Sequence, residues 1–172
     1  VPGVYLNGEL FANGKVDAAA LVDRLLELYP GIAHVAHQTS LPLQDVTVIG
    51  GGPAGVSAAI YAARKGLKVT VVADRVGGQV KDTMGIENLI SVPYTTGPEL
   101  SGALLQHLRQ YNITLKEHLR VKQIERGDIK SLTLSSGERI DTRSLIIATG
   151  ARWRELGVPG EKENIGNGVA YC

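Results

Sequence analysis

The sequence predicts an α/β fold in which a central parallel sheet is flanked by helices. Two apolar runs, "VTVIG" at 46–50 and "LKVTVVA" at 67–73, have the composition of strands that are buried on both faces. The segment between them, "GGPAGVSAAIYAARKG", is rich in small and apolar residues and predicts a helix that ends at Gly66. A strand, a helix and a strand within about 30 residues form a βαβ unit, the building block of a Rossmann-like sheet.

The first 29 residues predict a hairpin and a helix. "VYLNG" is a short strand that ends in the turn pair Asn7-Gly8, and "KVDAAALVDRLLELY" is a helix with Asp17 as its candidate N-cap. Because a hairpin and one helix are too small to bury a core, we expect residues 1–29 to be the C-terminal remnant of a domain that starts upstream. The apolar stripe of the helix consists of Leu21, Val22, Leu25, Leu26 and Tyr29.

A linker is predicted at 30–44. This segment contains two prolines and a glycine and has no regular apolar period. His34 and His37 lie three residues apart, but no acidic residue or cysteine accompanies them, so we expect no metal site. The second domain is then expected to begin at residue 45 and to continue to residue 172.

The second domain carries further predicted elements after the βαβ unit. "GPELSGALLQHLRQY" predicts a helix with Pro98 near its first turn. The segments "ITLKEH", "RVKQIE" and "IKSLTLSSGERID" predict strands, and the Ser136-Gly137 turn in the third indicates a small antiparallel hairpin or meander. The last apolar run, "SLIIATG" at 144–150, predicts another buried strand.

Composition argues against several classes of function. The net charge of +1 argues against a nucleic-acid or acidic-lipid partner, and an aromatic content of 5% argues against a platform for stacking single strands. One cysteine excludes an internal disulfide framework and predicts a reducing, cytoplasmic location. No apolar run approaches the roughly 20 residues that span a bilayer, so we expect no membrane partner.

A glycine-rich motif indicates a dinucleotide site. Gly50, Gly52 and Gly55 form G-x-G-x-x-G between a predicted strand and a predicted helix, and Asp74 ends the following strand. In this pattern the first glycine permits the tight turn, the second lets the backbone approach a pyrophosphate, and the third lets helix and strand pack closely. The helix N-terminus would bind the pyrophosphate, and the Asp74 carboxylate would accept hydrogen bonds from a ribose diol.

Three downstream segments favour FAD over NAD as the dinucleotide. "GGQ" at 77–79 is a second glycine loop, "IENLISVP" at 86–93 places Asn88 in a loop before a helix, and "LIIATGA" at 145–151 ends a strand in Thr-Gly. A domain that binds only NAD does not need these extra positions. An NAD-linked dehydrogenase that uses the first βαβ unit for nicotinamide stays open as an alternative.

These motifs identify a family resemblance. "VIGGGPAG", "GGQ", "IENLISVP", "IIATGARWRELGVPGE" and "GVAYC" resemble the FAD-dependent pyridine nucleotide–disulfide reductases of the thioredoxin-reductase type. Within that family the chain is most similar to the branch formed by the F subunits of bacterial alkyl hydroperoxide reductases. "VPGVYLNG" resembles the last hairpin of the thioredoxin-like domain that this branch carries upstream, with Pro2 at the place of its cis-proline.

The resemblance implies a role for each motif residue. The FAD pyrophosphate would be held by Gly50, Gly52, Pro53, Ala54 and Gly55. The adenosine end would meet the side chain of Asp74, with Arg75 close by, and the backbone of Val121. The residues expected near the ribityl and isoalloxazine parts are Gly78, Gln79 and Asn88. The segment expected to close over the cofactor is Ala148, Thr149 and Gly150.

The resemblance also implies an activity. Cys172 matches the first cysteine of a C-x-x-C pair beside the flavin, which would relay electrons from NADH or NADPH through FAD to a peroxiredoxin partner. The family further implies a homodimer. Because the sequence stops before the second cysteine, we expect these 172 residues to be part of a longer enzyme and inactive alone. The alternatives are thioredoxin reductase itself and a cofactor-binding fragment without catalysis.

Overall fold

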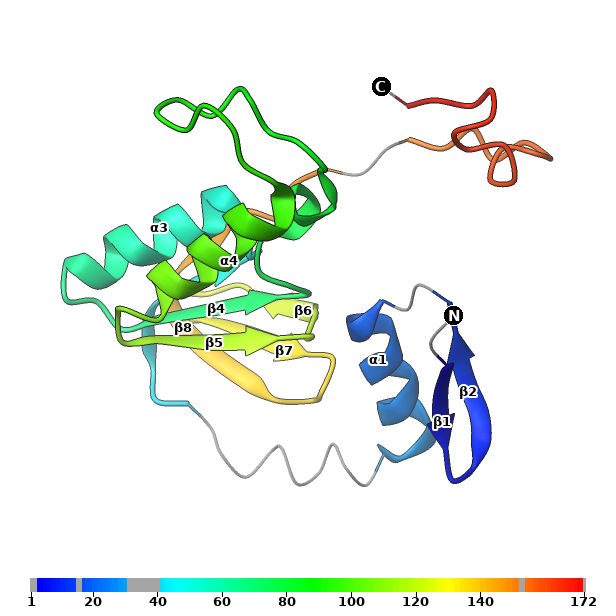
Figure 1. Cartoon of the computed structure of the whole chain (residues 1–172). Coiled ribbons are helices and arrows are strands. Elements are labelled where there is room, and N and C mark those ends of the chain that lie inside the picture. Colours follow the sequence, from blue (N-terminus) through cyan, green and yellow to red (C-terminus); the bar gives the residue numbers. More distant parts are fainter. Residues whose placement is uncertain (1–2, 15–16, 31–40, 152–153, 172) are drawn as a thin grey trace.

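The computed structural model describes residues 3–14, 17–30, 41–151 and 154–171. It shows a layered α/β domain preceded by a separate hairpin and helix, so the predicted fold class is confirmed (Figure 1). The proposed boundary between the two parts stays a prediction, since most of the segment 30–44 lies outside the described residues, as do both of its histidines. None of the helices in the described ranges is long and apolar enough to cross a lipid bilayer.

One mixed sheet forms the centre of the layered domain. In the part of the chain that the structure describes, its strand order is β5-β4-β3-β8-β7-β6. The first four strands in that order are mutually parallel, and β8, β7 and β6 form an antiparallel meander. The strands are β3 (Gln44–Ile49), β4 (Val69–Ala73), β5 (Ile113–Glu117), β6 (Val121–Glu125), β7 (Lys130–Leu134) and β8 (Arg139–Ile147).

Two helices lie side by side on one face of the parallel strands (Figure 1). Helix α3 (Pro53–Arg64) begins with a proline, whose fixed φ and missing N–H suit the first helical position. Helix α4 (Gly97–Leu108) begins with a capping box, in which the Thr96 hydroxyl accepts from the Glu99 N–H and the Glu99 carboxylate accepts from the Thr96 N–H. A short 3₁₀ helix, η1 (Gly78–Asp82), contacts α4.

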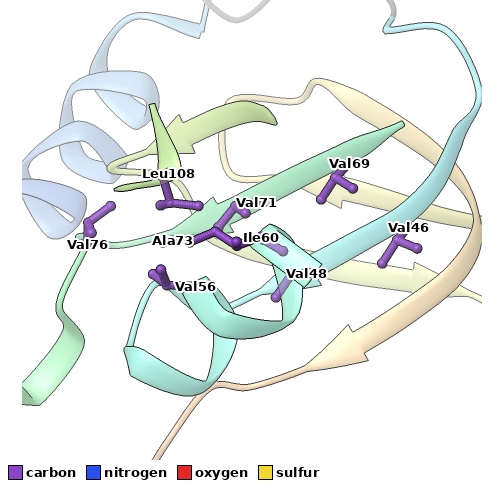
Figure 2. Close-up of a cluster of buried hydrophobic side chains, with 10 residues drawn as sticks. Val46, Val48, Val56, Ile60, Val69, Val71, Ala73, Val76 and Leu108 are labelled. Atoms are coloured by element: carbon purple, nitrogen blue, oxygen red, sulfur yellow. The ribbon is translucent and has the colours of Figure 1, made fainter. Parts of the chain in front are cut away.

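The parallel strands are apolar on both faces because each face covers a core. Towards the helices, Val48 of β3 and Val71 of β4 pack with Val56 of α3 and Leu108 of α4 (Figure 2). Successive residues of a strand point to opposite faces, so Val72 faces the meander. There it forms a second core with Leu132, Leu134 and Ile140. The continuous valine-rich run of β4 follows directly from this burial on two sides.

The last predicted strand is confirmed as a strand, but the prediction that it is buried was wrong at its end. Ile147 is 66% exposed and Ile146 is 37% exposed. The partner strand β7 pairs with β8 only from Arg139 to Thr142, and beyond that point β3 flanks β8 on one side. The apolar residues at the carboxyl end of β8 therefore lie at the border of the described sheet.

The N-terminal unit is the predicted hairpin and helix. Strands β1 (Gly3–Leu6) and β2 (Glu9–Asn13) pair antiparallel around Asn7 and Gly8, whose positive φ angles of 52° and 88° suit a two-residue hairpin turn. Helix α1 (Ala18–Leu28) is capped by Asp17, as predicted, because its carboxylate accepts from the Ala19 N–H at 3.1 Å.

The second core gives a test of the layered fold. We expect Leu132→Ala to lower the free energy of unfolding by about 2–5 kcal/mol, because it removes a fully buried side chain and leaves a cavity. Ile124→Ala, on the outer strand β6 where the side chain is 38% exposed, is the matched control and should cost less than half as much. Urea denaturation would measure both, and equal losses would contradict the meander packing.

Candidate functional site

The first glycine loop lies where the carboxyl ends of β3 and β8 meet the start of α3. Gly50 has a φ of 118°, and a Cβ added there would lie 2.1 Å from the carbonyl oxygen of Ala148. A Cβ added to Gly55 would lie 2.0 Å from the carbonyl oxygen of Gly50. These two glycines are therefore required by backbone packing.

Gly52 is different, because its missing side chain faces open space. A Cβ added there meets no atom within 4 Å, and its φ of −73° is one that any residue adopts. Gly52 is also the N-cap of α3, so the orphan N–H groups of the first turn, at Ala54 and Gly55, begin next to it. Open space in front of a helix N-terminus fits a bound pyrophosphate.

The second glycine loop packs against the first. The Gly77 N–H donates to the Gly51 carbonyl at 2.7 Å, and a Cβ added to Gly78 would lie 3.4 Å from the Cα of Gly52. Both Gly77 and Gly78 have positive φ angles, so this approach depends on glycine. The structure thus brings two of the predicted cofactor segments together.

The third predicted segment joins them at the end of β8. The Ala148 N–H donates to the Ile49 carbonyl at 2.8 Å, which aligns the ends of β8 and β3. Gly150 follows with a φ of 74°. From the other side, the side-chain amide of Gln79 donates to the carbonyl of Ala151. Segments 50–55, 77–79 and 148–151 therefore meet at one edge of the sheet, with Thr149 between Ala148 and Gly150.

Asp74 lies at the carboxyl end of β4, as predicted, but its ion-pair partner is not Arg75. The Arg75 guanidinium binds Asp82 of η1 instead. The Asp74 carboxylate is bound by Arg120, whose Nε lies 3.0 and 3.1 Å from its two oxygens. This interaction is the main cause of the raised pKa of Arg120. Val121 is the first residue of β6 and follows Arg120 directly in the chain. Its backbone is therefore adjacent to the residue that binds Asp74.

Two predicted residues are not placed in this cluster. Asn88 is exposed in a loop between η1 and α4, which is held by the bridges between Ile86 and Thr95 and between Leu89 and Val92. Figure 1 shows this loop projecting away from the sheet. Cys172 lies outside the described residues, so its predicted role stays a prediction.

The segment that leads to Cys172 is organised by one carboxylate. The buried Glu161 accepts hydrogen bonds from the N–H groups of Leu156 at 2.8 Å and Gly157 at 2.6 Å, and from the Tyr171 hydroxyl at 2.9 Å. These bonds, chiefly the one from Leu156, lower the pKa of Glu161. They tie the beginning of the segment 156–171 to its end.

A family model described as pyridine nucleotide-disulphide oxidoreductase matches residues 44–172. This chain belongs to that family. The match covers both glycine loops, Asp74 and the end of β8.

Curated relatives carry two kinds of name. A protein named NADH dehydrogenase from Ferdinandcohnia aciditolerans is 46% identical over the whole chain, which covers 32% of that relative. A protein named as the F subunit of alkyl hydroperoxide reductase, from Staphylococcus aureus, is 47% identical, again over the whole chain, which covers 33% of it. The chain thus spans about a third of the length of these relatives, and the likeness to the second of them agrees with the branch expected from the motifs.

Solved structures of family members share the fold. The thioredoxin reductase from Lactococcus lactis superposes with a TM-score of 0.67 and 38% identity, over 75% of this chain and 43% of that one. The thioredoxin reductase from Streptococcus pyogenes gives a TM-score of 0.65 and 39% identity, over 76% and 42% respectively.

Two residues of the site, Arg120 and Glu161, were not predicted from the sequence. Arg120 is one of several basic residues after the helix α4, and no motif singles it out. Glu161 lies in "GVPGEKE", two residues before an equally acidic Glu163, and only the folded loop distinguishes the two. Arg120 binds Asp74 from 46 residues away, so no local pattern could predict that pair. Glu161 binds Leu156 and Gly157 within five residues and Tyr171 ten residues away, and these contacts depend on how the loop folds.

The Glu161 contacts predict a pH-dependent loop. Because folding lowers the pKa of this carboxyl from its ordinary 4.5, its stabilisation is complete above that value and is lost as the pH falls through the lowered pKa. We expect Glu161→Gln to loosen segment 156–171 at neutral pH and Glu163→Gln to leave it unchanged. NMR titration of the Leu156 and Gly157 amides would measure this. A midpoint at or above 4.5, or equal effects of both variants, would contradict the assignment.

Proposed function

We propose that the protein carrying this sequence is a flavoprotein disulfide reductase. In this proposal electrons pass from NADH or NADPH, by way of FAD and a dithiol that includes Cys172, to a peroxiredoxin that reduces hydroperoxides. The supporting observation is the meeting of two glycine loops and the end of β8 around open space at the N-terminus of α3. A homodimer and a cytoplasmic location, both expected from the family resemblance and the single cysteine, form part of the same proposal.

The described residues would bind FAD along the edge of the sheet. The pyrophosphate would lie over Gly52, Pro53 and Ala54, where N–H groups and the helix dipole favour an anion. The Asp74 carboxylate, 39% exposed, keeps lone pairs free for the adenosine ribose hydroxyls beside its bond to Arg120. Gly78, Gln79 and the turn at Gly150 would line the route from the pyrophosphate towards the flavin.

FAD would supply the hydride and electron chemistry, and the chain would bind and orient it. The disulfide that includes Cys172 would then receive the electrons on the protein and be reduced to a dithiol. A thiolate attacks a disulfide through a mixed-disulfide stage, and a second thiol is needed to resolve it. The contacts of Glu161 with Leu156, Gly157 and Tyr171 would hold the backbone just before that thiol in one arrangement.

A second candidate function has support from a relative's name. The protein named NADH dehydrogenase is as similar to this chain as the one named for alkyl hydroperoxide reductase. We therefore keep an NADH dehydrogenase, which transfers electrons to an acceptor other than a peroxiredoxin, as the alternative. Both candidates need FAD and differ in whether Cys172 takes part.

A substitution at Gly52 tests cofactor binding without disturbing the fold. We expect Gly52→Ala to weaken FAD binding by at least about tenfold, because its methyl group would occupy the space in front of the helix N-terminus. The same change should alter the free energy of unfolding by no more than about 0.5 kcal/mol, because the methyl meets no protein atom. Quenching of flavin fluorescence on titration with FAD would measure the affinity.

Gly55→Ala is the matched control for this test. Its methyl group would collide with the Gly50 carbonyl, so we expect a loss of about 1–3 kcal/mol in stability that Gly52→Ala does not share. Unchanged FAD affinity in the folded Gly52→Ala variant would overturn the proposed pyrophosphate position.

Cys172→Ser separates the two candidate functions. In the protein that carries this sequence, we expect the change to abolish NAD(P)H-dependent reduction of a peroxiredoxin disulfide, because serine cannot form the mixed disulfide. Reduction of ferricyanide by NAD(P)H should persist, because it does not use the thiol. Unchanged peroxiredoxin reduction would rule out the role of Cys172, and activity with ferricyanide but never with a peroxiredoxin would favour the alternative.

A further inference from the structure

Arg120 contacts acidic side chains from two separate parts of the chain. Besides the Nε contacts with Asp74, its Nη2 donates to Asp17 at 2.7 Å and its Nη1 lies 4.0 Å from Asp23. Asp74 belongs to the layered domain, whereas Asp17 and Asp23 belong to α1 and its cap in the N-terminal unit. One guanidinium thus joins the two units at the carboxyl edge of the sheet, and Figure 1 shows α1 to the right of the sheet, beyond the arrowheads of β4 and β5.

The backbone of Arg120 is fixed, which makes the guanidinium a firm attachment point. The Arg120 N–H donates to the Ser135 hydroxyl at 3.2 Å, and the Ser135 N–H donates back to the Arg120 carbonyl at 2.7 Å. Ser135 lies in the turn between β7 and β8, next to the buried meander core. The side chain of Arg120 is 35% exposed, so the acidic side chains of the N-terminal unit can reach its guanidinium from outside the layered domain.

The carboxylates around Arg120 favour a cation that all of them share. Asp17, Asp23 and Asp74 face the Arg120 guanidinium. The neighbouring cation Arg75 binds Asp82 instead. Without Arg120, the carboxylates of Asp17 and Asp23 would approach Asp74 as like charge against like charge. The planar guanidinium has donors on several sides, so it can bind Asp74 and Asp17 at the same time, which a lysine ammonium does less well.

We propose that Asp17, the cap of α1, and Asp23, within the helix, dock on Arg120, so that this guanidinium ties the N-terminal unit to the carboxylate that would bind the FAD ribose. The covalent connection between the units raises their effective concentration, so a contact of modest strength suffices for docking. Only the identity of the Asp74 ligand rests on the proposed function.

Docking is tested by scattering without any cofactor. Removing the two α1 charges with Asp17→Asn and Asp23→Asn, or the cation with Arg120→Ala, should undock the unit and raise the radius of gyration of the full chain. Asparagine is as good an N-cap as aspartate, so Asp17→Asn preserves the start of the helix. Glu27→Gln is the matched control, because this α1 acid is exposed and the same charge is removed.

Cofactor binding gives a second and separate readout. If Arg120 orients Asp74, Arg120→Ala should weaken FAD binding by about two- to fivefold, the range expected for a partly exposed ion pair. Arg120→Lys should recover part of the lost FAD affinity. Asp74→Asn should weaken FAD binding more than Arg120→Ala does. Unchanged FAD affinity in Asp74→Asn would remove the ribose assignment and leave the scattering result to decide the docking.

Two results would overturn the docking proposal. One is an unchanged radius of gyration in both the α1 double variant and Arg120→Ala. The other is an equal expansion in Glu27→Gln, which would indicate a general effect of charge. If docking is as proposed, expansion of the unsubstituted chain should also appear between about 0.05 and 0.5 M salt, because exposed ion pairs are screened.

Discussion

The carboxyl edge of the sheet depends on how closely the backbone at Gly50 approaches its neighbours. Its N–H donates to Val72 of β4, its Cα lies against the Ala148 carbonyl after β8, and its own carbonyl lies against Gly55 of α3. One residue without a side chain therefore sets the spacing of two strands and a helix. A Cβ at Gly50 would push the segment after β8 outward and separate the segments that meet above it.

That close packing has an electrostatic consequence. It directs the N-terminus of α3 and the end of β4 to the same edge, so the helix end that would favour an anion lies at the same edge as the Asp74 carboxylate. A dinucleotide has this polarity, with a pyrophosphate next to a ribose diol. The cation Arg120 offsets the charge of Asp74, whose carboxylate is still 39% exposed and keeps lone pairs for further donors.

The sequence predicted those parts of the fold that are determined by local pattern. The strands β3 and β4, the helices α1, α3 and α4 and the Asp17 cap follow from periodicity, capping and glycine spacing. That the three loop segments serve one cofactor was expected from their motifs and the family resemblance, and the structure adds that these segments meet. The exposure of Ile147 could not be predicted, because it depends on where β7 stops pairing with β8. The ion pair between Asp74 and Arg120 could not be predicted either, because Arg75 is adjacent to Asp74 in sequence yet binds Asp82.

The two units of the chain are joined differently from the layers within the domain. Neither buried core includes a described residue of the N-terminal unit, whereas Arg120 bridges the units through ion pairs. Apolar cores hold layers together with many kcal/mol, but a partly exposed ion pair contributes about 0–1 kcal/mol. The junction can therefore open and close without disturbing either fold. Because Arg120 also binds Asp74, each such opening would change the surroundings of the carboxylate to which we assign the ribose.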